Sequence, residues 1–147
     1  MPRRVLAIAA AVGSAVVIDL ILYGGGRAIG GTFRFTTPSG PATVDAVTVA
    51  AFSALPLLVG LGAVALLARL GDWVTRTALI VGPLLAVGTI VVMTLPADFD
   101  VVSRVTLALC HLVLVPIIVV AVRALARRDP HPGSATWESS SRSGVTR

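Results

Sequence analysis

The sequence predicts an all-α membrane protein in which four transmembrane helices form an up-down-up-down bundle. Of its 147 residues, 56% are hydrophobic and only 13% are charged, about half the roughly 25% charged residues of a typical soluble domain. The apolar residues form long runs with the charges clustered between them, at about residues 5–23, 46–68, 77–95 and 102–122. Each run is long enough to cross a bilayer, because about 20 helical residues span roughly 30 Å.

The first run contains an acid, Asp19, well inside its apolar region. A cleaved signal peptide is the competing interpretation of this basic start and apolar run. We favour an uncleaved helix, because Asp19 interrupts the run and no convincing Ala-x-Ala cleavage site follows it. Three alanines precede the acid at intervals of four residues and lie on the same helix face as Asp19: Ala7, Ala11 and Ala15. Such a face lets a second membrane helix pack closely.

Residues 24–45 form the longest link between runs, and their glycines are expected to break regular structure from Gly24 onward. Within this link, the alternation of residues 32–36 predicts a short strand or one arm of a hairpin. A phosphate-binding loop is disfavoured, because no Gly-x-Gly-x-x-Gly register fits the glycines. We expect a flexible outer loop in which Phe33 and Phe35 rest on the membrane surface with Arg34 between them.

Each later run contains a proline, which frees a backbone carbonyl and predicts a helix kink. These prolines are Pro56, Pro83 and Pro116. The link between the second and third runs is short, and we expect Gly71 to end one helix and Asp72 to cap the next. The second and third helices are therefore predicted to be antiparallel neighbours.

Two carboxylates, Asp98 and Asp100, lie in the link before the fourth run. Asp100 is expected to cap the fourth helix, where a negative charge suits the positive end of the helix dipole. A cation site is the alternative. Capping is favoured, because no further oxygen ligands lie nearby in the sequence.

The fourth run carries two bases, Arg104 near its start and His111 near its middle. Ionisable side chains are rare inside a membrane and need partners there. At about 1.5 Å of rise per residue, Asp19 lies between the two bases in depth. We therefore predict an intramembrane polar cluster of Asp19, Arg104 and His111. Asp19 can pair with either base, or with both through water, and the sequence does not choose among these arrangements.

This cluster has two competing interpretations. In a structural role, its charges offset each other's desolvation and fix the register of the helices. In a functional role, Asp19 and His111 form a proton relay or an ion site, as intramembrane acids and histidines do in transporters. We favour the structural role, because Arg104 is long enough to reach both Asp19 and the membrane surface.

All twelve basic residues are arginine, and their positions predict the topology. With a cytoplasmic N-terminus, only Arg27, Arg34 and Arg104 lie outside, and the positive-inside rule is satisfied. We therefore expect a multi-pass protein of the cell membrane with both termini in the cytoplasm. Residues 127–147 are rich in serine and cannot bury a core, which predicts a disordered cytoplasmic tail.

Several function classes lack the residues that they need. The chain has no Lys, Asn or Gln, which removes a Schiff-base lysine, a Walker lysine and amide donors for an oxyanion. Cys110 is the single cysteine, and no metalloprotease or serine-hydrolase motif is present. We expect no enzyme activity, cofactor, metal or nucleic acid. The expected partners are the lipid bilayer and a second copy or another membrane protein.

Two segments resemble a family of small four-helix membrane proteins. These are Val-Asp-Ala-Val-Thr-Val-Ala-Ala at residues 44–51, after a Gly/Thr loop, and Arg-Val-Thr-Leu-Ala-Leu-Cys-His-Leu-Val at residues 104–113. The family comes from high-GC Gram-positive bacteria and is known only as a domain of unknown function. The resemblance covers about residues 4–125 and implies four spans and no particular activity. In that family the residue before the histidine is often Met, whereas this chain has Cys110.

Three functional hypotheses follow. The first is a structural or accessory membrane protein that acts through partners or self-association. The second is a small proton-coupled transporter that works as an oligomer. The third is a sensor that uses the outer loop at residues 24–45.

Overall fold

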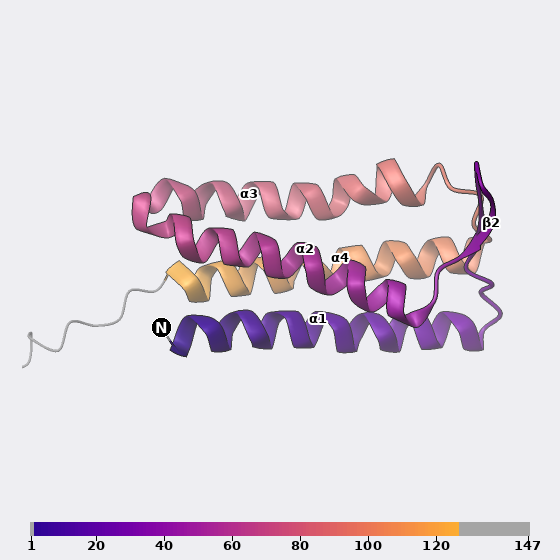
Figure 1. Cartoon of the computed structure of the whole chain (residues 1–147), viewed down its shortest axis with the longest axis horizontal. Coiled ribbons are helices and arrows are strands. Elements are labelled where there is room, and N and C mark those ends of the chain that lie inside the picture. The colour runs from indigo at the N-terminus through magenta and orange to yellow at the C-terminus, as the bar shows by residue number, and fades with distance from the viewer. Residues whose placement is uncertain (1, 127–147) are drawn as a thin grey trace, which may run out of the picture.

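The computed structural model describes residues 2–126, in which four long helices run side by side (Figure 1). They are α1 (Pro2–Ala28), α2 (Ala46–Leu67), α3 (Asp72–Thr89) and α4 (Val101–Ala126). A 3-10 turn, η1 (Ala68–Leu70), joins α2 to α3, and a π-helical turn, η2 (Ile90–Thr94), extends α3. All four helices are long and apolar enough to cross a membrane, which confirms the predicted helical bundle. The tail predicted at residues 127–147 lies outside the described residues.

The two ends of the bundle differ. At one end, called the hairpin end below, strands β1 (Arg34–Thr37) and β2 (Gly40–Thr43) cover the helices (Figure 1). The opposite end, called the turn end, carries η1, the start of α1 and the last turn of α4 (Figure 1). The hairpin is antiparallel and pairs Arg34 with Thr43 and Thr37 with Gly40, which confirms the strand predicted near residues 32–36.

Helix α1 does not end at Gly24, as the glycine-rich sequence predicts, but continues to Ala28. The reason is a close helix contact at Gly26, which is buried. A Cβ atom on Gly26 would lie 2.5 Å from Thr106 Oγ1 and 2.9 Å from the ring of Phe33. Packing of this kind outweighs the helix-propensity cost of glycine, which is roughly 1 kcal/mol per residue. A continuous helix also satisfies its own backbone hydrogen bonds.

The packing of the helices is uneven. Helix α1 packs against both α2 and α4, and α3 packs mainly against α4. Helices α2 and α3 are antiparallel, as predicted, but they contact one another little (Figure 1). Contact of α3 with α4 is close at Gly82, where a Cβ atom would lie 2.7 Å from Cγ2 of Ile118. Helix α3 therefore packs mainly on α4 and leaves space beside its antiparallel neighbour α2.

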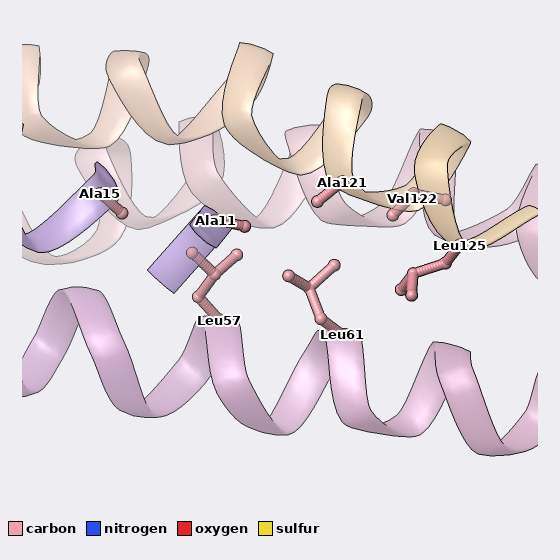
Figure 2. Close-up of a cluster of buried hydrophobic side chains, with 7 residues drawn as sticks. All are labelled: Ala11, Ala15, Leu57, Leu61, Ala121, Val122 and Leu125. Atoms are coloured by element: carbon pink, nitrogen blue, oxygen red, sulfur yellow. The ribbon is translucent and has the colours of Figure 1, made fainter. Parts of the chain in front are cut away.

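The apolar core lies where α1, α2 and α4 meet (Figure 2). Its members are alanines on α1, leucines on α2 and residues of mixed size on α4: Ala11, Ala15, Leu57, Leu61, Ala121, Val122 and Leu125. The small-residue face predicted on α1 is confirmed, because its alanines let the branched side chains approach the helix axis. Asp19 continues this buried face by one turn toward the hairpin end.

The turn between α2 and α3 differs slightly from the prediction. Gly71 has a φ of +144°, as expected of a glycine that reverses the chain, and it occupies the cap position of α3. Asp72 is the first helical residue rather than the cap, so α3 begins one residue earlier than a cap at Asp72 implies. An acid in the first turn still suits the positive end of the helix.

The loop at the hairpin end is anchored rather than lying free on a membrane surface. Phe33 is 0% exposed, packs against Tyr23 with ring centroids 4.6 Å apart, and donates its N–H to Ser103 Oγ at 2.8 Å. Its burial corrects the prediction that this ring rests on lipid. Phe35 is half-buried against Phe99, at 5.1 Å, and Arg34 is exposed.

Two carboxylates attach this loop to the bundle. Asp100 accepts the N–H of Ser103 at 2.9 Å, which confirms the predicted cap of α4. The same carboxylate accepts the hydroxyls of Ser103 at 2.6 Å and Thr32 at 2.7 Å. Asp98 accepts the N–H and the hydroxyl of Thr36 at 2.7 Å and 2.6 Å. These hydrogen bonds hold the pKa of each carboxyl below its usual value. The largest contribution comes from the Ser103 hydroxyl at Asp100 and from the Thr36 hydroxyl at Asp98.

Candidate functional site in the polar centre of the bundle

Asp19 lies at the junction of three helices and is 0% exposed. Its Oδ2 atom accepts a hydrogen bond from the Ser53 hydroxyl of α2. Cys110 of α4 contacts its backbone carbonyl, with Sγ 3.9 Å from the oxygen. Among residues 2–126, Oδ1 has no hydrogen-bond partner. Asp19 is thus held on one side by α2 and α4 and keeps one carboxyl oxygen unpaired.

Arg104 does not pair with Asp19, so the structure does not show this one of the pairings that the sequence left open. Its Nη2 atom donates to the carbonyl oxygens of Ala97 and Phe99, each at 3.2 Å. These carbonyls belong to the link between η2 and α4, outside any helix, and the guanidinium group supplies hydrogen-bond donors to them. The arginine side chain therefore extends toward the hairpin end, as long basic side chains do near the ends of membrane helices.

His111 lies near Asp19, so the structure brings these two predicted residues together. The Nδ1 atom of His111 is 2.8 Å from the carbonyl oxygen of Leu107 and donates to it, which assigns the proton of a neutral ring to that nitrogen. The other ring nitrogen, Nε2, is then free to accept. His111 and Asp19 line the same cavity and are close enough to interact electrostatically.

This polar cavity has a volume of about 230 Å³ and lies at the hairpin end of the bundle. Its polar lining includes Asp19, Ser53, Cys110 and His111. Helix α2, the turn η2, the link before α4 and α4 itself contribute apolar residues, and Phe35 of the hairpin also lines the cavity. Asp19 therefore borders a cavity whose lining is otherwise mostly apolar.

A second cavity, which we call the α2–α3 cleft, adjoins the first and has a volume of about 300 Å³. It fills the space left by the weak contact of α2 with α3, and α4 forms its base. Exposed side chains at its margin, such as Val81 and Leu85, show that the cleft opens on the surface of the bundle. Four residues line both cavities and join them: Phe52, Ser53, His111 and Leu114.

The hydroxyl of Ser53 couples the backbone of α2 to the ionisation of Asp19. This hydroxyl has one proton and two acceptors within reach, Asp19 Oδ2 and the carbonyl oxygen of Val49 at 2.9 Å. An ionised Asp19 accepts a hydrogen bond from the Ser53 hydroxyl. A protonated Asp19 instead donates a hydrogen bond to the Ser53 oxygen, and the Ser53 hydroxyl then donates to the carbonyl oxygen of Val49. The site can thus hold Asp19 in either state and offer Oδ1 to a donor in the cavity.

The three side chains Asp19, Ser53 and His111 do not form a hydrolytic triad. In such a triad the histidine lies between the serine and the acid. Here Ser53 bonds to Asp19 directly, and the Nδ1 atom of His111 is bonded to its own helix. The arrangement can bind a donor or hold a proton.

Sequence reasoning missed Ser53 and Cys110 as neighbours of Asp19. Comparing the distances of Ser53 and Asp19 from the hairpin end of their helices could have found Ser53. Ser53 lies seven residues after the start of α2, and Asp19 lies nine residues before the end of α1. Both are therefore roughly 10–14 Å from the hairpin end of their helices. Pro56, Pro83 and Pro116 lie inside continuous helices, and the kinks predicted there stay predictions.

The chain was compared with known proteins. A family model described as a family of unknown function (DUF6069) matches residues 1–128, a range that contains all four helices. No curated protein and no solved structure matches the chain. The resemblance seen at residues 44–51 and 104–113 to a domain of unknown function is confirmed. The chain is therefore a multi-pass membrane protein, with four helices suited to crossing a membrane, that belongs to the family of unknown function DUF6069.

Proposed function

We propose that this protein acts in the cell membrane as an accessory protein that binds an apolar partner molecule taken from the lipid phase. The observation that carries this proposal is the α2–α3 cleft, an apolar cavity of about 300 Å³ that opens on the surface of the bundle. Ligand sites are typically apolar cavities of about 300–1,000 Å³ with a few polar groups that orient the ligand. Ser53 and His111 supply such groups at the inner end of the cleft.

The arginines support a cytoplasmic location for the turn end. Arg3, Arg4, Arg69, Arg76 and Arg123 lie in helical segments at that end, whereas Arg27, Arg34 and Arg104 lie at the hairpin end. The positive-inside rule then places the termini in the cytoplasm and the hairpin outside. In this orientation the α2–α3 cleft faces the lipid along the membrane-spanning part of the bundle.

Filling the cleft should abolish binding without disturbing the fold, and Gly60 offers the position for this test. Gly60 lines the cleft and has no atom within 4 Å of the place where a Cβ would lie. We expect Gly60→Phe to reduce the saturable binding of a fluorescent fatty-chain probe to the purified protein in lipid nanodiscs by about tenfold or more, because a ring occupies the volume of the ligand.

Gly62→Phe is the matched control for this experiment. Gly62 lies two residues further along the same helix, also has free space around it, and does not line either cavity. The probe should bind Gly62→Phe as it binds the wild-type protein. Equal binding by all three proteins would show that the probe does not use the cleft and would contradict the proposal.

A small proton-coupled transporter is a second candidate, and one observation favours it. Asp19, with an unpaired oxygen, and His111 line one cavity that joins the cleft. A carboxyl group and an imidazole in one intramembrane cavity can exchange a proton for a ligand. A pH-dependent uptake that is lost in a stably inserted Asp19→Asn protein would favour transport over binding alone.

The two remaining hypotheses have less support. A sensor based on residues 24–45 would need a loop that moves, whereas the hairpin is attached to the bundle through Asp98 and Asp100. We also infer no enzyme activity, a view supported by the absence of a Ser–His hydrogen bond among the described residues of the polar centre, where His111 is bonded through Nδ1 to its own helix.

A further inference from the structure

We propose that the partner molecule is an amphiphilic amine, whose protonated N–H group binds Asp19 and whose single apolar chain lies in the α2–α3 cleft. This inference rests on the proposed function, since it names the chemical class of the ligand that the cleft receives. It is carried by the unpaired oxygen of Asp19, by the charges around the two cavities and by the way the cavities join.

One carboxyl oxygen of Asp19 lacks a donor in the described part of the chain. Asp19 is 0% exposed, and its Oδ1 atom has no hydrogen-bond partner among residues 2–126 although Oδ2 is bonded to Ser53. A buried acceptor without a donor is costly, and more so when it is charged. The atom belongs to a residue that lines the polar cavity, so a ligand in that cavity can supply the missing donor.

The charged groups around the two cavities favour a cation. Among the described residues, Asp19 is the one carboxyl group that lines either cavity, and no arginine lines them. The other titratable groups facing Asp19 are His111 and Cys110, both from α4, and α2 presents the neutral Ser53. Arg104, the nearest candidate for a counter-charge on α4, bonds to backbone carbonyls instead. An ammonium group complements this site, and an anionic head group is repelled by it.

The two cavities adjoin along four residues that line both: Phe52, Ser53, His111 and Leu114. An amine bound at Asp19 would extend its chain past these residues toward the part of the cleft that Gly60 and Gly82 line. Asp19 lies nine residues from the end of α1, roughly 14 Å from the hairpin end of that helix. Cavities of about 230 Å³ and 300 Å³ suit one apolar chain better than the two chains of a bilayer phospholipid.

The identity of the head group can be tested on the wild-type protein with ligands of one chain length. We would reconstitute the full chain in phosphatidylcholine nanodiscs and measure the binding of radiolabelled dodecylamine, with empty nanodiscs as the correction for partitioning. Dodecanol, dodecyltrimethylammonium and dodecanoate serve as competitors. Dodecylamine should bind about tenfold or more tightly than dodecanol, because a charge-assisted hydrogen bond is added.

The quaternary ammonium has the charge but no N–H, so it should bind more weakly than dodecylamine, and dodecanoate should not compete. Equal affinities of dodecylamine and dodecanol, or of dodecylamine and dodecyltrimethylammonium, would overturn the inference while leaving an apolar ligand in the cleft. The absence of saturable binding by every compound would overturn both this inference and the proposed function.

A pair of variants locates the effect. Asp19→Asn should lower the affinity for dodecylamine to that for dodecanol and leave dodecanol binding unchanged. Asp98→Asn removes a carboxylate that lines neither cavity, and it should preserve the preference for the amine. If Asp19→Asn does not fold, the ligand series on the wild-type protein decides alone. A preference for the amine that survives in a folded Asp19→Asn protein would overturn the inference.

Discussion

Replacing Phe33 with alanine is expected to lower the free energy of unfolding by about 3–5 kcal/mol, the usual cost of removing a fully buried aromatic ring. Phe33 is 0% exposed and fills the space between Tyr23 of α1 and the first turn of α4. Its loss leaves a cavity at the hairpin end, where the ring also packs against Gly26. The measurement is unfolding of the purified protein in a denaturing detergent, followed by circular dichroism.

Phe35→Ala is the matched control for this prediction. Phe35 lies two residues along the same segment, is half-buried and packs against Phe99 at the surface. Its removal should cost clearly less than that of Phe33. Equal losses from the two variants would mean that Phe33 is not the buried anchor of the loop.

Substitution of Gly26 with alanine is expected to destabilise the protein by about 1–3 kcal/mol, the typical cost of overpacking. The added Cβ would lie 2.5 Å from Thr106 Oγ1 and 2.9 Å from Phe33, so α1 and α4 must separate. The same unfolding measurement applies, and the loss should be larger in Gly26→Val because a branched side chain needs more space.

Gly25→Ala controls for helix propensity in the prediction at Gly26. Gly25 lies in the same helix and has no atom within 4 Å of the place of a Cβ. Alanine there should be neutral or stabilising, since it favours the helix over glycine by up to roughly 1 kcal/mol. A Gly26→Ala protein as stable as Gly25→Ala would show that α1 does not approach α4 closely at this end.

The helices of this protein could be predicted from the sequence because their cause is local. Hydropathy and length determine whether a segment can cross a bilayer, and both are visible in runs such as residues 46–68. The end of α1 could not be predicted in this way. Three successive glycines indicate a break by local propensity, and the contact of Gly26 with Thr106, far away in the sequence, decides otherwise.

The candidate site was predictable in part. Asp19 and His111 attract attention because ionisable groups are rare in apolar helices, and the structure places both beside one cavity. The choice of partner depends on which donors lie close in three dimensions. Ser53 is one small hydroxyl among many, and Arg104 finds acceptors in the link before α4. The cleft itself follows from the packing of α3 on α4, and no single residue indicates it.

Asp19 is buried, accepts a hydrogen bond from Ser53 through one carboxyl oxygen and lines a cavity, and the proposed amine site depends on this arrangement. Infrared difference spectroscopy of the reconstituted protein tests this claim most directly, because the band that Asp19→Asn removes belongs to this carboxyl group. We predict that Ser53→Ala shifts the band. Ser14→Ala should leave it unchanged, since Ser14 bonds only within its own helix, to Ala11 at 3.0 Å. An identical band in the wild-type and Ser53→Ala proteins would contradict the claim.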